Sequence, residues 1–290
     1  MAIREHPFIR FIRVAGPIEA IHVVFEALKA LSRCQISLQQ LTRVHPALFQ
    51  LMSRGWVLDS ITVRKGDLRF HIDDCLYNVY GTFEVEEYAL EDSLVGKTVF
   101  DVGANIGDTA IYFARRGARV VAFEPLPEVY RRALVNVHLN GFDSGVVIHN
   151  VAIGAKEDII RINEHSIKLH SSGGFSVHAS SREESSRGTA VRVARLSSFL
   201  EGEDPYLLKL DCEGSEYDII LEDYSSVRQF HVVFAEWHEG ETGIPVSKLV
   251  DKLREDFDVS LVYGVGDSRG AANAHEATGM LLARRRAGVL

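Results

Sequence analysis

The chain has 290 residues, of which 46% are hydrophobic and 25% are charged, and its formal net charge at pH 7 is −8. This composition is typical of a globular protein and excludes a disordered or fibrous chain. The negative charge disfavours a large nucleic-acid footprint, so we expect no nucleic-acid partner.

The cysteines and the N-terminal sequence indicate the cellular compartment of the protein. The three cysteines, Cys34, Cys75 and Cys212, show no metal-ligand spacing, and a sparse odd set is typical of reduced thiols. We see no charged region followed by an uninterrupted apolar core, so we expect no signal peptide. Residues 18–31 are the most apolar early stretch, but they are too short and too charged to span a bilayer. The sequence therefore predicts a cytoplasmic protein without a membrane span.

Residues 1–92 are expected to form an N-terminal helical region and a hairpin. Apolar residues recur at helical spacing over residues 17–33 and more weakly over 38–48. Short strands over 56–63 and 68–72 flank a turn that contains Gly66. Residues 1–70 hold ten Lys and Arg against five Asp and Glu. This excess indicates either an ordinary solvated surface or a basic face toward an anionic partner. We expect the region to pack on the main domain or to join two copies of the chain.

Residues 98–108 read Thr-Val-Phe-Asp-Val-Gly-Ala-Asn-Ile-Gly-Asp and predict a strand, a glycine turn and the start of a helix. In open α/β sheets such a turn is where a ligand sits, because the backbone approaches it closely. The spacing Gly103-x-x-x-Gly107 differs from the G-x-G-x-x-G of dinucleotide sites. A turn with only a structural purpose is the alternative.

The next predicted strand, 119–123, ends at an acid. Glu124 lies 23 residues after Asp101. An acid at the tip of the second strand is placed to accept hydrogen bonds from both hydroxyls of a ribose.

The rest of the chain continues the alternation of strands and helices, with one interruption. A strand is predicted over 146–153, and residues 154–196 then break the rhythm with short strands at 159–162 and 191–193. The Ser- and Gly-rich segment 164–189 between them is predicted to act as a lid over the site. Further strands are predicted over 206–210, 231–236, 259–263 and 279–283. Seven strands interleaved with helices indicate a doubly wound α/β sheet over residues 93–290.

Three motifs resemble one family. They are D-V-G-A-N-x-G at 101–107, V-A-F-E-P at 121–125, and L-K-L-D-C-E-G-S-E at 208–216. Together they resemble the FkbM-type branch of the class I S-adenosylmethionine-dependent methyltransferases, over residues 96–285. The resemblance implies a seven-stranded Rossmann-like sheet of order 3-2-1-4-5-7-6 with the last strand antiparallel. It also implies S-adenosylmethionine as cofactor, and O-methylation of a small metabolite, a glycan or a lipid-linked sugar.

The resemblance also assigns cofactor contacts, although Asn150 and Ala152 could instead be strand-end packing. Tyr88 precedes the first strand of the sheet, where members of the family place a lid residue. The expected cofactor-binding residues are Asp101, Gly103, Ala104, Asn105, Gly107, Glu124, Asn150, Ala152 and Asp211.

Catalytic groups should lie at the carboxyl ends of the fourth and fifth strands, beside the cofactor's methyl group. Five ionisable residues come from those ends, namely Asp211, Glu213, Glu216, Glu236 and His238. We predict that Asp211, Glu213 and His238 converge there on the acceptor oxygen. In one mechanism His238, with an unperturbed pKa near ~6.5, is a general base. In the other the carboxylates hold Mg²⁺. We favour metal-free catalysis because no third carboxylate is clearly placed, and we assign no metal ligands.

Two other functions remain alternatives. A nucleotide-binding or structural partner with a decayed catalytic site is one, although the complete set of Asp101, Gly103, Gly107 and Glu124 argues against loss of cofactor binding. A nicotinamide-linked oxidoreductase is the other, and it lacks its usual glycine turn.

Overall fold

The computed structural model describes residues 47–59, 61–72, 76–162, 188–262 and 278–288. The expected helix over 17–33 lies outside these residues, as do Cys34, Cys75 and nearly all of the expected lid over 164–189. Association through the N-terminal region therefore stays a prediction. Within the described ranges, no helix is both long and apolar enough to cross a membrane.

The chain divides into two compact units, one formed by Met1–Glu87 with His138–Asn140 and the other by Tyr88–Val137 with Gly141–Leu290. In the first unit, residues 47–53 are helical. Its other elements are β1 (Val57–Asp59), β2 (Thr62–Lys65), β3 (Leu68–His71), α4 (Leu76–Tyr80) and the π-helical turn η1 (Gly81–Val85).

The expected single strand over 56–63 is wrong. The chain reverses after Asp59, so β1 and β2 pair with each other in antiparallel register, and β3 then pairs with β2. Thr62 Oγ1 donates to the carbonyl of Asp59 at 2.9 Å, which closes the tight turn between the two strands. The result is a three-stranded sheet, in which β2 and β3 form the predicted hairpin around Gly66 and β1 is an additional strand.

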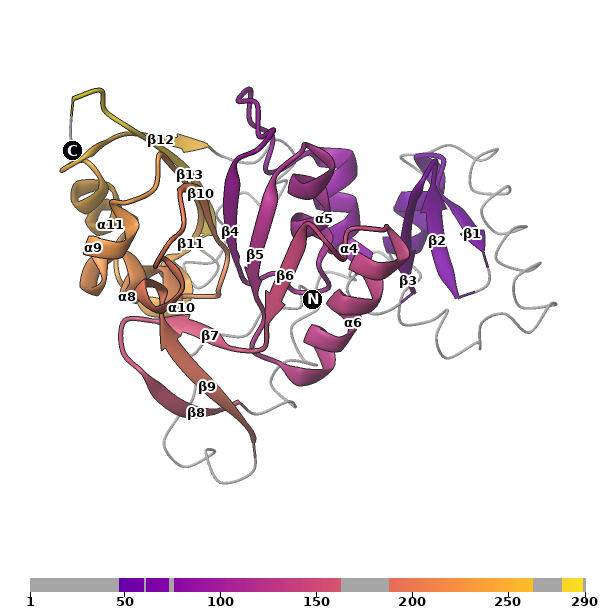
Figure 1. Cartoon of the computed structure of the whole chain (residues 1–290), viewed down its shortest axis with the longest axis horizontal. Coiled ribbons are helices and arrows are strands. Elements are labelled where there is room, and N and C mark those ends of the chain that lie inside the picture. The colour runs from indigo at the N-terminus through magenta and orange to yellow at the C-terminus, as the bar shows by residue number, and fades with distance from the viewer. Residues whose placement is uncertain (1–46, 60, 73–75, 163–187, 263–277, 289–290) are drawn as a thin grey trace, which may run out of the picture. The chain divides into compact units, whose positions relative to one another are not determined.

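The second unit is built on a seven-stranded sheet (Figure 1), with the order β12-β13-β11-β10-β4-β5-β6. Only β13 runs antiparallel to its neighbours. Numbered along the chain, this is the predicted order 3-2-1-4-5-7-6, so the expected topology is confirmed. The strands are β4 (Thr98–Val102), β5 (Arg119–Phe123), β6 (Val146–His149), β10 (Pro205–Leu210), β11 (Val232–His238), β12 (Phe257–Val262) and β13 (Thr278–Arg285).

Helices connect these strands. β5 and β6 are added on one side of β4, and β10 and β11 on its other side. Because parallel crossovers are right-handed, the helices after β4 and β5 therefore lie on the face opposite to those after β10 and β11. The first set is α5 (Asp108–Arg115) and α6 (Pro127–Leu139); the second is α8 (Ser215–Glu222), α9 (Tyr224–Val227), α10 (Glu239–Thr242) and α11 (Val246–Leu253).

The predicted strand over 146–153 is wrong in its second half. β6 ends at His149, and the chain then enters a separate sheet of order β7-β9-β8 (Figure 1). In this sheet β7 pairs parallel with β9, and β8 pairs antiparallel with it. Its strands are β7 (Ala152–Gly154), β8 (Asp158–Ile162) and β9 (Thr189–Arg195), and the 3-10 turn η3 (Leu196–Phe199) follows.

Alternation along β4 sets the two faces of the main sheet. Phe100 and Val102 join a large apolar core with residues of α8 and α11, such as Ile219 and Leu249. Asp101 points to the opposite face, where Thr109 of α5 donates to it. The sheet therefore buries an acid on the α5 face, directly before the glycine turn.

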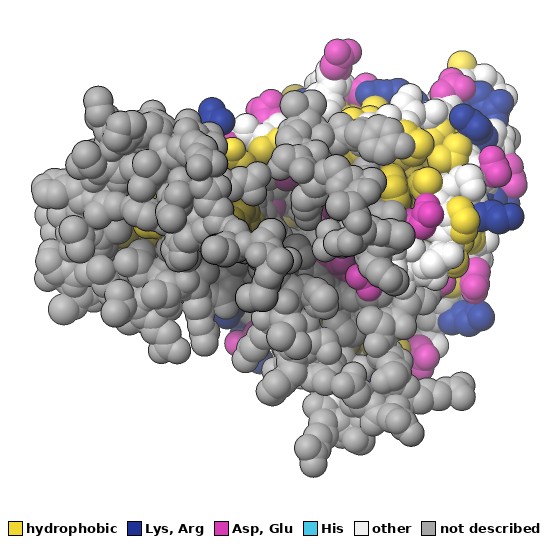
Figure 2. Space-filling model, turned by 180° about the vertical axis from the view of Figure 1, so that it is seen from behind, with side chains coloured by type: hydrophobic (Ala, Val, Ile, Leu, Met, Phe, Trp, Pro, Cys, Tyr) yellow, Lys and Arg dark blue, Asp and Glu magenta, His cyan; other side chains and the backbone are white. Residues whose placement is uncertain are grey.

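The described surface in Figure 2 carries acidic and basic side chains that are interspersed, with hydrophobic ones between them. On that face the described residues form no continuous basic patch.

Candidate active site

The turn after β4 is held by the chain's own backbone. The N–H groups of Gly103 and Ala104 both donate to the carbonyl of Phe123 at 3.0 Å. The φ angle of Gly103 is +82°, and a Cβ atom there would lie 1.8 Å from the carbonyl oxygen of Asp211. A side chain at Gly103 would therefore collide with the residue that follows β10.

Gly107 begins α5. Its φ of +83° suits glycine, and a Cβ there would lie 3.3 Å from the Cα of Ala133 in α6. The two glycines thus allow the turn to pack tightly against its neighbours on both sides.

Glu124, at the end of β5, is tied to this turn. Its Oε2 accepts from the N–H of Asn105 at 3.1 Å, and its Oε1 accepts from the N–H of Leu126 at 2.8 Å. The residue is only 6% exposed, and this burial raises the pKa of the carboxyl to about 8. The predicted ribose acid is therefore fixed in orientation by two backbone amides.

Asn150 and Ala152 follow β6. The side-chain amide of Asn150 donates to the carbonyls of Glu124 and Pro125, both at 2.9 Å. Ala152 is the first residue of β7 and is half-buried. Both expected cofactor contacts thus lie close along the chain to the end of β6, and Asn150 stabilises the loop that carries Glu124.

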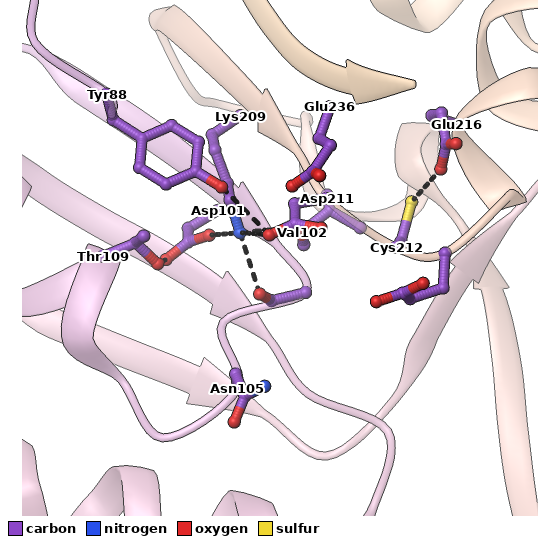
Figure 3. Close-up of polar contacts among 12 residues, drawn as sticks. Tyr88, Asp101, Val102, Asn105, Thr109, Lys209, Asp211, Cys212, Glu216 and Glu236 are labelled. Atoms are coloured by element: carbon purple, nitrogen blue, oxygen red, sulfur yellow. Dashed lines mark hydrogen bonds and ion pairs between the residues drawn. The ribbon is translucent and has the colours of Figure 1, made fainter. Parts of the chain in front are cut away.

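A buried lysine lies beneath the turn (Figure 3). Lys209 of β10 donates to the carbonyl of Gly103 at 2.8 Å and lies 3.1 Å from Asp101 Oδ1 and 3.8 Å from Asp211 Oδ2. Burial alone would lower the pKa of Lys209, but the charges of Asp101 and Asp211 outweigh it and raise that pKa. Asp101 also accepts from Thr109 at 2.6 Å. Asp101 and Lys209 therefore form a buried ion pair that is further stabilised by this hydrogen bond.

Tyr88 is part of the same network. Its hydroxyl donates to Asp211 Oδ2 at 2.9 Å, and its ring packs edge-on against Phe234 and Phe113. The residue is 3% exposed. The family resemblance marks Tyr88 as a lid residue, but its contact with Asp211 could not be predicted, because no spacing rule links residues 123 positions apart.

The structure brings the three expected catalytic residues together. Ligand atoms of Asp211, Glu213 and His238 all lie within 4.8 Å of one another. A further carboxylate, that of Glu236, comes within 3.9 Å of His238 Nε2. Figure 3 shows the Glu236 side chain directed toward Asp211. The group lies at the carboxyl ends of two adjacent parallel strands, β10 and β11. We call Asp211, Glu213, Glu236 and His238 the acid–histidine cluster.

Glu216 of α8 holds the histidine. This fully buried carboxylate accepts from Nδ1 of His238 at 2.8 Å and from its backbone N–H at 3.1 Å. It also accepts from the N–H of Gly214 and from the Cys212 thiol. Burial, and then the charge of Glu216, raises the pKa of that thiol, so Cys212 is no thiolate nucleophile.

The electrostatics of the cluster differ from the expectation for His238. Burial lowers its pKa, but the hydrogen bond and charge of Glu216, with the charges of Glu236 and Glu213, outweigh burial and raise the pKa to about 10. This environment thus moves the pKa of His238 away from the unperturbed value near ~6.5. Burial raises the pKa of Glu213 to about 7. The cluster holds more negative charge than its one histidine balances.

A family model described as the methyltransferase FkbM domain matches residues 101–260, which is more than half of the chain. The matched range runs from β4 into β12. It contains the glycine turn, Glu124 and the whole acid–histidine cluster.

Similar proteins of known sequence or structure are more distant. The chain is 28% identical over 228 residues to the AMB antimetabolite synthetase AmbE of Pseudomonas aeruginosa; the alignment covers 63% of this chain and 11% of that protein's length. The precorrin-6y C5,15-methyltransferase of Geobacter metallireducens is 13% identical, with a TM-score of 0.40 and coverage of 69% and 86% of the two chains. The magnesium protoporphyrin IX methyltransferase of Synechocystis PCC 6803, solved with bound SAM, is 11% identical, with a TM-score of 0.42 and coverage of 72% and 79%.

Proposed function

The chain belongs to the FkbM methyltransferase family, and from that premise we propose that it transfers a methyl group from S-adenosylmethionine to a hydroxyl of a small metabolite, a glycan or a lipid-linked sugar. The observation that supports the proposal is the contact between the glycine turn and the acid–histidine cluster. The glycine turn, with Glu124 beside it, packs at Gly103 against the backbone of Asp211, and Asp211 belongs to the acid–histidine cluster.

The cofactor half of the proposal rests on backbone and carboxylate groups. An acid at the end of the second strand is suited to accept from ribose hydroxyls, and Glu124 is already oriented by the N–H groups of Asn105 and Leu126. We propose that Asp101, Gly103, Ala104, Asn105, Gly107, Glu124, Asn150, Ala152 and Asp211 form the cofactor site.

The acceptor half rests on the acid–histidine cluster. In methyl transfer the acceptor oxygen attacks the methyl carbon in line with the sulfur, the carbon–sulfur bond breaks, and a thioether leaves. The hydroxyl proton must also be removed. We propose that the acceptor lies against Asp211, Glu213 and His238. Because Nδ1 of His238 is held by Glu216 and its Nε2 faces Glu213 and Glu236, we assign proton removal to the carboxylates of the cluster.

Cofactor binding distinguishes this proposal from its two alternatives. Isothermal titration calorimetry should show S-adenosylmethionine binding to the full chain and no binding of NAD. Binding of NAD alone would favour the oxidoreductase, and binding of neither would favour a protein that has lost its cofactor site.

The reaction itself needs an acceptor screen with a radiolabelled methyl donor. An accepted hydroxyl compound should gain label with the native chain and lose most of that gain with Glu213→Gln. The matched control is Glu241→Gln, which changes an exposed acid of α10 and should keep full activity. Labelling that Glu213→Gln leaves intact would contradict the acceptor site.

A further inference from the structure

We propose that the acid–histidine cluster, formed by Asp211, Glu213, Glu236 and His238, is a binding site for a hard divalent cation of the Mn²⁺ and Mg²⁺ type. The inference concerns binding by the folded chain alone, so it stands or falls separately from the proposed methyl transfer.

The spacing of the side chains fits ligands around one ion. His238 Nε2 lies 3.6 Å from Glu213 Oε2 and 3.9 Å from Glu236 Oε1, which is too long for hydrogen bonds. Ligand atoms of Asp211, Glu213 and His238 lie within 4.8 Å of one another. Atoms at about 2.0–2.6 Å from a shared cation are separated by roughly 3–5 Å, so these distances suit a common centre.

The histidine gives a second, independent indication. Its side chain is only 9% exposed, and no hydrogen bond to its Nε2 is found among the described residues. Its Nδ1 is engaged by Glu216, which itself is fully buried, so the ring presents Nε2 to the carboxylates. A metal-binding histidine is commonly held in this way by a carboxylate on its other nitrogen. A cation would displace the Nε2 proton on binding, because a histidine ligand binds metal as the neutral imidazole.

Charge balance points the same way. Three carboxylates converge in the cluster, and the nearby Lys209 is already paired with Asp101 and the carbonyl of Gly103. Lys209 approaches the cluster only at Asp211, at 3.8 Å. A divalent cation would offset the mutual repulsion of the carboxylates. Glu236 provides a third carboxylate at this site. The lack of a clearly placed third carboxylate was the reason to favour metal-free catalysis from the sequence.

The ligand set indicates the class of cation. Carboxylate oxygens suit Mg²⁺ and Mn²⁺, and one imidazole nitrogen shifts the preference toward Mn²⁺. The side chains of Asp211, Glu213 and Glu236 are 28%, 26% and 28% exposed. Part of the coordination sphere therefore stays open, so that water or a substrate hydroxyl has room to bind. A cation there would lower the pKa of a bound hydroxyl.

The test is a titration of the full chain with MnCl₂, after treatment with a chelator and without cofactor or acceptor. Electron paramagnetic resonance measures free Mn²⁺, because the six-line signal broadens when the ion is bound by the protein. We expect one saturable site per chain, and Mg²⁺ in excess should compete for it. Absence of saturable binding would overturn the proposal whatever the chain's methyltransferase activity proves to be.

Variants identify the ligands. Glu213→Gln and Glu236→Gln should each weaken Mn²⁺ binding by at least about tenfold, and Glu216→Gln, which acts through His238, by roughly 10–100-fold. The control Glu241→Gln should bind as the native chain does. Equal binding by Glu236→Gln and the control would overturn the assignment. Circular dichroism verifies folding, and Mn²⁺ should raise the melting temperature of the native chain more than that of Glu236→Gln.

Discussion

The carboxyl group of Glu124 joins the end of β5 to the glycine turn, and its proposed contribution to the free energy of cofactor binding can be measured directly. Above a pH of about 8, where the carboxyl of Glu124 is ionised, replacing Glu124 by Ala should weaken S-adenosylmethionine binding by about 2–3 kcal/mol, because hydrogen bonds to a charged group contribute on that scale. Calorimetry gives the value, and Glu128→Ala, at an exposed acid of α6, is the control. An unchanged dissociation constant in a folded Glu124→Ala chain would remove the ribose assignment.

Glu124 also predicts a pH dependence of stability. Its pKa is about 8 in the folded chain and 4.5 ordinarily, so the folded state keeps a proton that the unfolded state releases in this window. The stability from this group is complete below pH 4.5 and is lost as the pH rises through 8. The slope is at most about 1.4 kcal/mol per pH unit. Urea unfolding at several pH values should show this slope in the native chain and a shallower one in Glu124→Gln. Equal slopes would show that the group is ionised when folded.

Substitutions at Gly103 and Gly202 distinguish the steric cost of a side chain from the cost of its backbone conformation. Gly103→Ala should lower the free energy of unfolding by about 2–5 kcal/mol, since it combines positive φ with a collision against the carbonyl of Asp211. Gly202 has a similar φ of +76° but open space around it. Gly202→Ala should therefore cost only about 1–2 kcal/mol. Equal losses in denaturant unfolding would mean that the contact with Asp211 relaxes freely.

At the scale of single residues, the sequence predicted the glycines, Glu124 and three members of the cluster, because strand ends and spacing identify them. It did not predict the binding partners of Tyr88 or the approach of Glu236 to His238. Tyr88 meets Asp211 only through the packing of its ring on Phe234 and Phe113. The pKa of His238 likewise depends on Glu216, which lies 22 positions away in the chain.

Among the elements, β4 and β10 are neighbours that share a buried charge. Lys209→Met should destabilise the chain by about 3–5 kcal/mol, because it leaves Asp101 buried without its counter-ion. Lys248→Met, at an exposed position of α11, should change the unfolding free energy by less than about 0.5 kcal/mol. Chemical denaturation of the two variants provides the comparison. A small loss in Lys209→Met would show that the buried pair of Lys209 and Asp101 contributes little to stability.

Element types were predictable from periodicity, but the ends of two strands were not. Val146 to Ile153 reads as one apolar run, yet the chain leaves the main sheet after His149 and pairs with β9 through β7. The partner strand lies about 40 residues away, so no local pattern shows the change of sheet. The reversal between β1 and β2 was missed for a similar reason: the run from Trp56 to Val63 has no glycine to mark the turn.

For the whole molecule, the extent of the methyltransferase unit is testable by truncation. A chain that starts at residue 93 lacks the buried Tyr88 and Leu90 and the ion pair between Asp92 and Arg284. We expect it to be less stable than a chain that starts at 88 by about 3–5 kcal/mol, at about 1.5–3 kcal/mol per buried apolar side chain. Denaturant unfolding of both, beside the full chain, measures the difference. Equal stability would support the boundary at 92/93 that the sequence predicts.

The order of the main sheet was predictable because the family resemblance implies it. The alternation of strands and helices alone indicates only a doubly wound sheet. The small second sheet and the division of the chain at Glu87 were not predictable, since both depend on contacts between distant segments.

The direct backbone contact between Gly103 and Asp211 determines a distance within the candidate site. With no side chain between them, the turn after β4 and the end of β10 touch directly, and the N–H of Asp211 donates to Val102 at 3.1 Å. The separation between the glycine turn and Asp211 is thus fixed by main-chain atoms. Substitutions of side chains around the contact can change charge and affinity, but they leave that length unchanged. Under the proposed function, an acceptor of a different size would have to be accommodated on the far side of the acid–histidine cluster.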